Sequence, residues 1–360
     1  MQRRVLLRTN PGDPRPVYIA GNFNSWQPGE PEYQLQPTGQ EGEYRIELQL
    51  SDGTEYVEYK FTRGAWDCVE LERYGHHAPN RRHLVGSRWT HIDMVERWAS
   101  GGMNFRADLL PRIEVISENF EIPQLIRTRR IAALLPHDYY ETDRHYPVLY
   151  LQDGQNLFDD YAPFGNWGVD KRLAMLAELG KGDIIIVSID HAREQRVAEF
   201  TPSFQTRLGH GDGKKYVRFL ADTLKPYIDD HFRTLPAPQY TGIGGSSMGG
   251  LISIYAGMMY PEVYDKLMIF SPALWVAPDM PYQLVDLTNE FNGRIYLYGG
   301  NAESSTMVPN LERFQQELAS REGASTVEFR LEIDPYGQHN EARWGEEFPK
   351  AIEWLFFAEE

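Results

Sequence analysis

A serine lies between a strand-like and a helix-like stretch in residues 240–255, which read YTGIGGSSMGGLISIY. Gly245 and Gly249 flank Ser247 in a Gly-x-Ser-x-Gly pattern, and another glycine follows directly. A sharp strand-to-helix turn strains the backbone and brings its neighbours close, which glycine tolerates. Such a turn lifts the serine hydroxyl toward a substrate and lets the Met248 amide face a developing oxyanion. The segment therefore predicts a nucleophilic serine, Ser247, with the Met248 N–H as an oxyanion donor.

A nucleophilic serine needs a base and an acid, and this chain offers both in the order serine, acid, histidine. His339 follows a strand-like run that ends at Ile333 and precedes a helix-like stretch, so it is the predicted base. Glu303 follows two glycines at the end of the preceding strand-like run. It is the predicted acid, which would accept the second imidazole N–H and hold the ring. Glu312, inside a helix-like stretch, and Asp334, close to the histidine along the chain, are the weaker alternatives.

The second oxyanion donor should lie in the loop after an early central strand, and residues 150–158, YLQDGQNLF, form such a loop. Gly154 permits the turn, which makes the Gln155 amide the predicted donor. The side chains of Asp153 and Asn156 are interpreted as braces of the loop. The carboxylates in this region have no histidine or cysteine beside them, so we expect no metal site and no cofactor.

Composition limits the class of protein. The chain has 360 residues, 41% of them hydrophobic, which is enough for a large core and favours two domains. Its formal charge of −16 argues against a nucleic-acid partner. A single cysteine, Cys68, excludes an intrachain disulfide. The start of the chain lacks the apolar run of a signal peptide and no later run suits a membrane span, so a cytoplasmic protein without a membrane partner is expected.

Two patterns divide the chain. Residues 1–97 alternate in short runs between Pro-, Gly- and Asp-rich turns, which predicts an immunoglobulin-like β-sandwich domain. Residues 98–110 contain the small residues of a linker, and residues 111–360 alternate strands with helices around a mostly parallel sheet, an α/β fold. Strands are expected at 113–116, 130–135, 147–152, 183–189, 266–270, 294–298 and 327–333, and helices at 169–179, 214–231, 251–259, 308–321 and 342–357.

Five motifs in the second part resemble one family. They are residues 151–158 (LQDGQNLF), 166–170 (NWGVD), 196–202 (RVAEFTP), 245–250 (GSSMGG) and 337–340 (GQHN). Together they resemble the putative-esterase branch of the α/β-hydrolases, which holds the enterochelin (siderophore) esterases, esterase D-like enzymes, and the feruloyl and acetyl-xylan esterases. The resemblance implies an α/β-hydrolase fold for residues 111–360 and a Ser247, Glu303 and His339 triad. It also implies backbone oxyanion donors at Met248 and Gln155.

The motif around the base departs from this family at one position. Glycine often stands in the family where this chain has Gln338. The departure concerns a contact beside His339 and leaves the base itself in place.

The N-terminal part carries a second resemblance. Residues 20–26 (AGNFNSW) and 58–66 (EYKFTRGAW) resemble the glycogen- and starch-binding modules. The resemblance implies that Trp26 and Trp66 stack on sugar rings while Lys60 and Asn80 bond to hydroxyls. A flat indole suits the apolar face of a pyranose. The alternative is that the same turn serves folding only, in a module that packs beside an active site.

The expected activity is that of a serine carboxylesterase acting through an acyl-enzyme on an acylated carbohydrate, such as a feruloyl or acetyl ester. Trp167 and Trp275, on loops at strand ends, are the predicted substrate-binding aromatic residues. The expected partners are a small-molecule or carbohydrate ester and a glycan at the N-terminal module. Three alternatives stay open: an esterase of a siderophore or another small ester, acyl transfer to an alcohol, and a glycan-binding protein whose hydrolase domain is inactive.

Overall fold

The computed structural model describes residues 2–11, 13–85, 92–162, 165–280, 291–320 and 327–358. The chain divides into two compact units, Met1–Asp108 and Leu109–Glu360. The predicted linker begins inside the first unit, because Trp98 is buried and its indole N–H donates to Thr9 Oγ1 over 2.9 Å. The first unit is therefore longer than the predicted domain 1–97.

The first unit consists of short strands. They are β1 (Gln2–Thr9), β2 (Tyr18–Gly21), β3 (Gln36–Pro37), β4 (Glu43–Gln49), β5 (Tyr56–Thr62), β6 (Glu70–Leu71), β7 (Arg81–Leu84), β8 (Asp93–Val95) and β9 (Arg97–Trp98). They form sheets of order β3-β4-β1-β8, β2-β5-β7 and β6-β9. The β1–β8 pair is parallel. Leu7 of β1 and Ile19 of β2 lie in one buried cluster, so the two larger sheets share a core.

The second unit alternates strands with helices. Its strands are β10 (Arg112–Ile122), β11 (Arg127–Leu135), β12 (Val148–Gln152), β13 (Ile185–Ile189), β14 (Thr241–Ser246), β15 (Lys266–Phe270), β16 (Arg294–Gly300) and β17 (Glu328–Asp334). Its helices are α1 (Val169–Glu178), α2 (Arg196–Phe200), α3 (Gly213–Phe219), the π-helix η7 (Leu220–Leu224), α4 (Lys225–His231), α5 (Met248–Met259), α8 (Met307–Ala319) and α9 (Glu341–Phe356).

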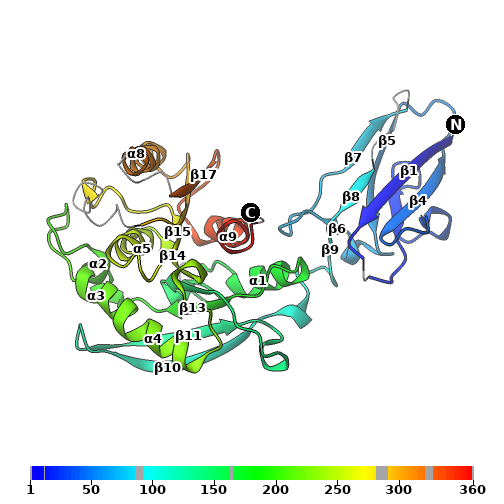
Figure 1. Ribbon diagram of the computed structural model, residues 1–360. Helices are drawn as coiled ribbons and strands as arrows, with labels where there is room; N and C mark the ends of the chain where they lie inside the picture. The colour runs from blue at the N-terminus through cyan, green and yellow to red at the C-terminus, as the bar shows by residue number, and fades with distance from the viewer. Residues whose placement is uncertain are drawn as a thin grey trace. The chain divides into compact units, whose positions relative to one another are not determined.

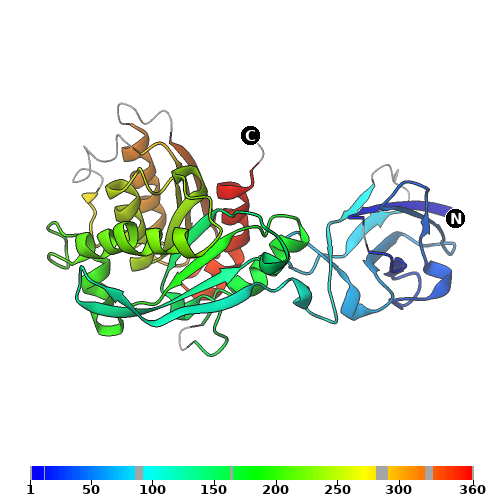
Figure 2. The same cartoon turned by 60° about the horizontal axis from the view of Figure 1, so that its bottom comes forward.

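All eight strands belong to one sheet of order β10-β11-β13-β12-β14-β15-β16-β17. The β10 and β11 strands form an antiparallel pair at one edge, and the long pair is visible in teal in Figure 2. From β13 to β17 the neighbouring strands are parallel. The carboxyl ends of these strands therefore meet at one edge of the sheet, which is where an open parallel sheet builds its site.

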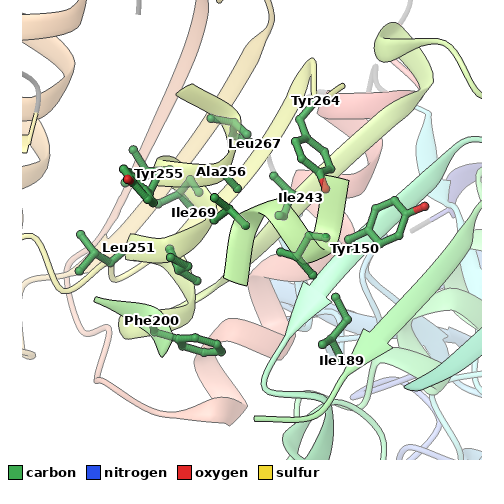
Figure 3. Close-up of a cluster of buried hydrophobic side chains, with 14 of the residues drawn as sticks. Tyr150, Ile189, Phe200, Ile243, Leu251, Tyr255, Ala256, Tyr264, Leu267 and Ile269 are labelled. Atoms are coloured by element: carbon green, nitrogen blue, oxygen red, sulfur yellow. The ribbon is translucent and has the colours of Figure 1, made fainter. Parts of the chain in front are cut away.

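Helices cover both faces of the sheet, because alternate side chains of a strand point to opposite faces. In β12, Tyr150 joins a buried cluster with side chains of α2 to α5 and α8, whereas Leu149 joins a second cluster with α1 and α9. Figure 1 shows α5 beside β14 and β15. Figure 3 shows part of the first cluster, which contains Leu251 of α5 together with the sheet residues Ile243 and Ile269.

Two helices differ from their expected form. The predicted helix 214–231 is interrupted by η7, so it consists of α3, a π-turn and α4. The predicted helix 251–259 begins earlier, at Met248. In the described part of the chain, every helix is too short or too polar to pass through a lipid bilayer.

Candidate active site

Ser247 occupies the sharp turn between β14 and α5. Its backbone angles, φ 55° and ψ −119°, lie in a region that side-chain-bearing residues rarely adopt. The turn is held in place by β15 and the loop after it. Ser247 N donates to Phe270 O over 3.0 Å, and Ala273 N donates to Ser247 O over 2.9 Å. The strained residue is thus fixed at the carboxyl edge of the sheet.

Glycine is required around this turn because the chain segments approach closely. A Cβ on Gly245 would lie 2.9 Å from the carbonyl carbon of Gly249, and a Cβ on Gly249 would lie 2.8 Å from Asp153 Oδ2. The start of α5 can therefore pack directly against the loop after β12. Met248 is the first residue of α5, where backbone N–H groups lack intrahelical acceptors and the helix dipole is positive.

The loop after β12 is braced by its side chains. Asp153, at φ 58°, accepts two hydrogen bonds from Arg196, from Nε over 2.6 Å and from Nη2 over 2.8 Å. Gln155 lies in the 3-10 turn η5 (Gly154–Asn156). Its side chain donates to His191 O over 3.0 Å and accepts from His191 N over 2.9 Å. These contacts fix the path of the backbone that carries the Gln155 N–H.

A mostly buried carboxylate, that of Asp190, contacts the same loop. Burial raises the pKa of Asp190, the residue after β13, to about 6, although Arg130 opposes the shift. The Asp190 side chain is 15% exposed, and its Oδ1 lies 3.7 Å from Arg130 Nη1. A Cβ on Gly154 would lie 2.5 Å from Asp190 Oδ1, so the carboxylate directly contacts the loop backbone. Burial also lowers the pKa of the neighbouring His191.

His339 and Glu303 lie beside each other, at the ends of β17 and β16. The distance between His339 Nδ1 and Glu303 Oε2 is 2.7 Å. The Glu303 side chain is 1% exposed and that of His339 is 41% exposed, so the pair has a buried acid and an accessible ring. Glu312 is exposed on α8, and Asp334 accepts from Tyr298 OH over 3.2 Å. Of the three carboxylates considered from the sequence, Glu303 is the one that the histidine contacts.

The loops that carry this pair are joined by backbone contacts. Asn301 N donates to Asp334 O over 3.0 Å, and Ala302 N donates to Gly337 O over 3.1 Å. A Cβ on Gly300 would lie 2.2 Å from Gly337 O, so neither side of this contact has room for a side chain. The acid loop and the histidine loop therefore form one hydrogen-bonded structure.

Ser271 and Trp344 surround the acid, and sequence reasoning assigned them no role there. Glu303 Oε1 accepts from Ser271 Oγ over 2.6 Å and from Gly300 N over 2.7 Å. Trp344 Nε1 donates to Ser271 Oγ over 2.9 Å, and its ring meets the His339 ring edge-on with centroids 4.9 Å apart. One signal in the sequence was available: Ser271 directly follows a buried parallel strand, where site residues gather.

The two predicted substrate-binding tryptophans have different environments. Trp275 is 49% exposed on the loop after β15, two residues beyond the Ala273 amide that bonds to Ser247. Trp167 is only 3% exposed and stacks on Phe270, with centroids 5.4 Å apart and planes at 22°. The prediction for Trp167 is wrong, because aromatic packing between the sheet and α9 leaves its ring no surface for a substrate.

The first unit holds a separate hollow of about 330 Å³. It is lined by the four residues predicted to bind carbohydrate and by two neighbours: Trp26, Lys60, Trp66, Asn80, Val69 and His77. The two indole rings lie 6.4 Å apart at 37°, and Trp66 is 42% exposed. Asn80 Nδ2 donates to Glu58 Oε1 over 2.9 Å, which orients the amide.

The turn that presents Trp26 is shaped by hydrogen bonds. Gly21 N donates to Asn24 Oδ1 over 2.9 Å, and Asn24 Nδ2 donates to Gln27 O over 3.1 Å. Trp26 itself has φ 58°. The Gly-Asn-Phe-Asn motif therefore has a structural role of its own, whatever the hollow binds.

Three known proteins illustrate what the chain is similar to. Uncharacterized protein YbbA of Bacillus subtilis (strain 168) is 23% identical over 241 residues, which is 63% of this chain and 92% of that protein. An alpha-amylase of Niallia circulans is 42% identical over 84 residues, 23% of this chain and 6% of that enzyme. The third is the crystal structure of the enterobactin esterase FES from Shigella flexneri in the presence of enterobactin. The match covers 99% of this chain and 92% of that chain, with a TM-score of 0.55 and 16% sequence identity.

A family model described as "Putative esterase" matches residues 122–355, a range that contains Ser247, Glu303 and His339. The same branch was predicted from the motifs. The matched range also covers all but the first strand of the eight-stranded sheet. The chain is thus a carboxylic ester hydrolase that belongs to the Putative esterase family.

Proposed function

We propose that the protein is a serine esterase that hydrolyses its substrate through an acyl-enzyme on Ser247. The observation that carries this proposal is the hydrogen bond between Glu303 and His339 at the same sheet edge as the strained Ser247 turn. A buried carboxylate on one imidazole nitrogen selects the tautomer whose other nitrogen accepts a proton. That arrangement suits general-base activation of a serine hydroxyl.

In the proposed reaction, His339 removes the hydroxyl proton while Ser247 Oγ attacks the ester carbonyl carbon. The oxyanion is held by the N–H groups of Met248 and Gln155, and its collapse breaks the bond to the alcohol oxygen, which leaves with the proton from His339. Water then attacks the acyl-enzyme in the same way, which releases the acid and restores the serine. Each step needs only the groups named here.

The proposed substrate is an acylated carbohydrate. Support comes from the hollow of the first unit, where Trp26 and Trp66 present rings beside Lys60 and Asn80. This combination of aromatic faces and hydrogen-bonding groups complements a sugar, whose faces are apolar and whose rim is polar. A stretch of 84 residues in this chain is also 42% identical to part of an alpha-amylase of Niallia circulans, which fits a carbohydrate substrate. Trp275 is the proposed contact for the acyl group, because it is exposed on the loop that bonds to the Ser247 backbone.

A serine-reactive fluorophosphonate and a substrate panel test the chemistry. We expect the probe to label Ser247, identified by peptide mass spectrometry, and we expect Ser247→Ala to lower kcat by about 10³-fold or more. Ser246→Ala is the matched control and should keep the label. The panel contains p-nitrophenyl acetate, methyl ferulate and acetylated xylan. Serine-independent turnover of every substrate would refute the mechanism.

Glycan titration tests the substrate class. Trp66→Ala should weaken binding of a soluble α-glucan or xylan oligosaccharide about tenfold or more, since a stacked aromatic ring dominates such sites. Tyr161→Ala, which removes another exposed aromatic ring, should have no effect. Equal binding by wild type and Trp66→Ala would contradict the carbohydrate role of the hollow.

A second candidate is the hydrolysis of a siderophore ester. It is favoured by the likeness to FES from Shigella flexneri, which extends over 99% of this chain and so over both units. Adding a catecholate triester to the substrate panel separates the two candidates. A kcat/KM for the triester at least tenfold above that for the carbohydrate esters would replace the carbohydrate proposal with this one.

A further inference from the structure

We propose that Ser271 is a positioning residue for the Glu303–His339 pair, and that Trp344 sets the direction of the Ser271 hydroxyl proton. The inference rests on the proposed function, because it concerns the acid and base of that mechanism. It adds a serine that touches no substrate atom and acts through the acid.

The direction of the Ser271 hydroxyl follows from the chemistry of its two neighbours. The indole N–H of Trp344 can only donate, so Ser271 Oγ must be the acceptor in their 2.9 Å contact. The single Ser271 proton is then left for Glu303 Oε1, 2.6 Å away. A carboxylate can only accept, so no other assignment satisfies all three groups.

Glu303 needs this donor because its side chain is 1% exposed. A buried carboxylate requires hydrogen bonds in place of the water that it has lost. Its Oε2 accepts from His339, whereas Oε1 accepts from Ser271 Oγ and from Gly300 N over 2.7 Å. Donors on both oxygens fix the plane of the carboxylate, and that plane sets the orientation of the imidazole ring.

The backbone of Ser271 is consistent with a special role. The residue is fully buried and has φ 43°, a left-handed conformation that favours glycine. Its N–H donates to Tyr298 O over 2.7 Å, which extends the contact between β15 and β16 beyond the sheet ladder. Strain of this kind at a non-glycine residue persists where the surroundings determine the conformation, and it gathers at functional sites.

Two substitutions separate the hydroxyl from the backbone strain. Ser271→Ala removes the hydroxyl and keeps the strain, whereas Ser271→Gly removes both. If the hydroxyl matters, both variants should lower kcat by about 10- to 100-fold, as expected for a hydrogen bond to a charged group. KM should change less than about twofold, because Ser271 is fully buried. Ser253→Ala, at another fully buried serine, is the control and should keep kcat.

Trp344→Phe tests the direction of the proton. This variant keeps an aromatic ring beside His339 but removes the donor to Ser271. We expect kcat to fall in the wild-type background and to change less than twofold further when Ser271 is already alanine, because the two residues act on Glu303 through one hydrogen-bond chain. A role in packing alone would give the same loss in both backgrounds.

The outcomes distinguish this inference from the proposed function. Fluorophosphonate labelling of Ser247 in the wild type tests the mechanism, and failure of labelling removes both proposals. Labelling together with an unchanged kcat in Ser271→Ala or Ser271→Gly overturns the positioning role alone. Thermal melting confirms that each variant is folded before its kcat is measured.

Discussion

Replacing Asp190 by asparagine should change how the stability of the second unit depends on pH. Burial raises the pKa of the Asp190 carboxyl to about 6, whereas the reference value is 3.8. Between these values the native state binds a proton that the unfolded state has released. The free energy of unfolding of the wild type should therefore fall as the pH rises from about 4 to about 6, and it should stay lower above that range.

The magnitude follows from the shift. A difference of about 2 pKa units corresponds to about 3 kcal/mol, at 1.36 kcal/mol per unit. The Asp190 side chain is 15% exposed, so solvent screens part of this energy and about 3 kcal/mol is its upper limit. Asparagine is neutral at every pH and similar in shape. Relative to the wild type, Asp190→Asn should therefore gain up to about 3 kcal/mol of stability between pH 4 and pH 8.

Urea unfolding at several pH values, followed by circular dichroism, measures this difference in stability. Loss of p-nitrophenyl acetate hydrolysis identifies which transition belongs to the second unit. Asp143→Asn, at an exposed position in the same unit, serves as the control and should follow the wild type. If the stabilities of Asp190→Asn and the wild type stay parallel across the whole pH range, the carboxyl is not desolvated under the loop and the reasoning fails.

Two further predictions concern contacts around the site. Gly249→Ala should lower kcat at least tenfold, because the new Cβ would lie 2.8 Å from Asp153 Oδ2 and must displace the loop. Steady-state kinetics measure this loss. Ser253→Ala, one turn further along α5, is the control that shows whether the helix tolerates alanine. Glu199→Gln should cost about 3–5 kcal/mol in urea unfolding, because the fully buried Glu199 carboxylate bonds to Arg127 and Arg129 over 2.6 Å each; a cost below 1 kcal/mol would mean that the charges are not paired in solution.

The sheet of the second unit could be predicted from the sequence because its strands are buried on both faces. The continuous apolar run 266–270 predicted a strand with the bounds of β15, and the run 147–152 predicted β12 to within one residue. The start of α5 was predicted late, since Gly249 and Gly250 read locally as poor helix formers. A Cβ on Gly249 would meet Asp153 after β12, and a Cβ on Gly250 would meet the backbone of Gly245 and Phe270. A local pattern does not contain these close contacts.

The surroundings of the acid could not be predicted for a similar reason. Ser271 and Glu303 are far apart in the chain, and they meet because β15 and β16 are neighbours in the sheet. Trp167 was predicted to contact the substrate from its place on a loop. Its burial results from packing against Phe270 and α9, which are distant in the sequence. Likewise, the parallel β1–β8 pair joins the two ends of the first unit, and no periodicity of one strand reveals its partner.

The backbone contacts between the acid loop and the histidine loop limit which changes of loop length this enzyme can tolerate. Asn301 and Ala302 bond to carbonyls of the opposite loop, and Gly300 touches Gly337 with no space between them. An insertion or deletion in either loop would break contacts in both, so the two must change together or not at all. The Trp275 side chain, in contrast, is 49% exposed, so it can change without breaking these backbone contacts. New substrate preferences should therefore arise in the loop after β15, while the loops that carry Glu303 and His339 keep their length.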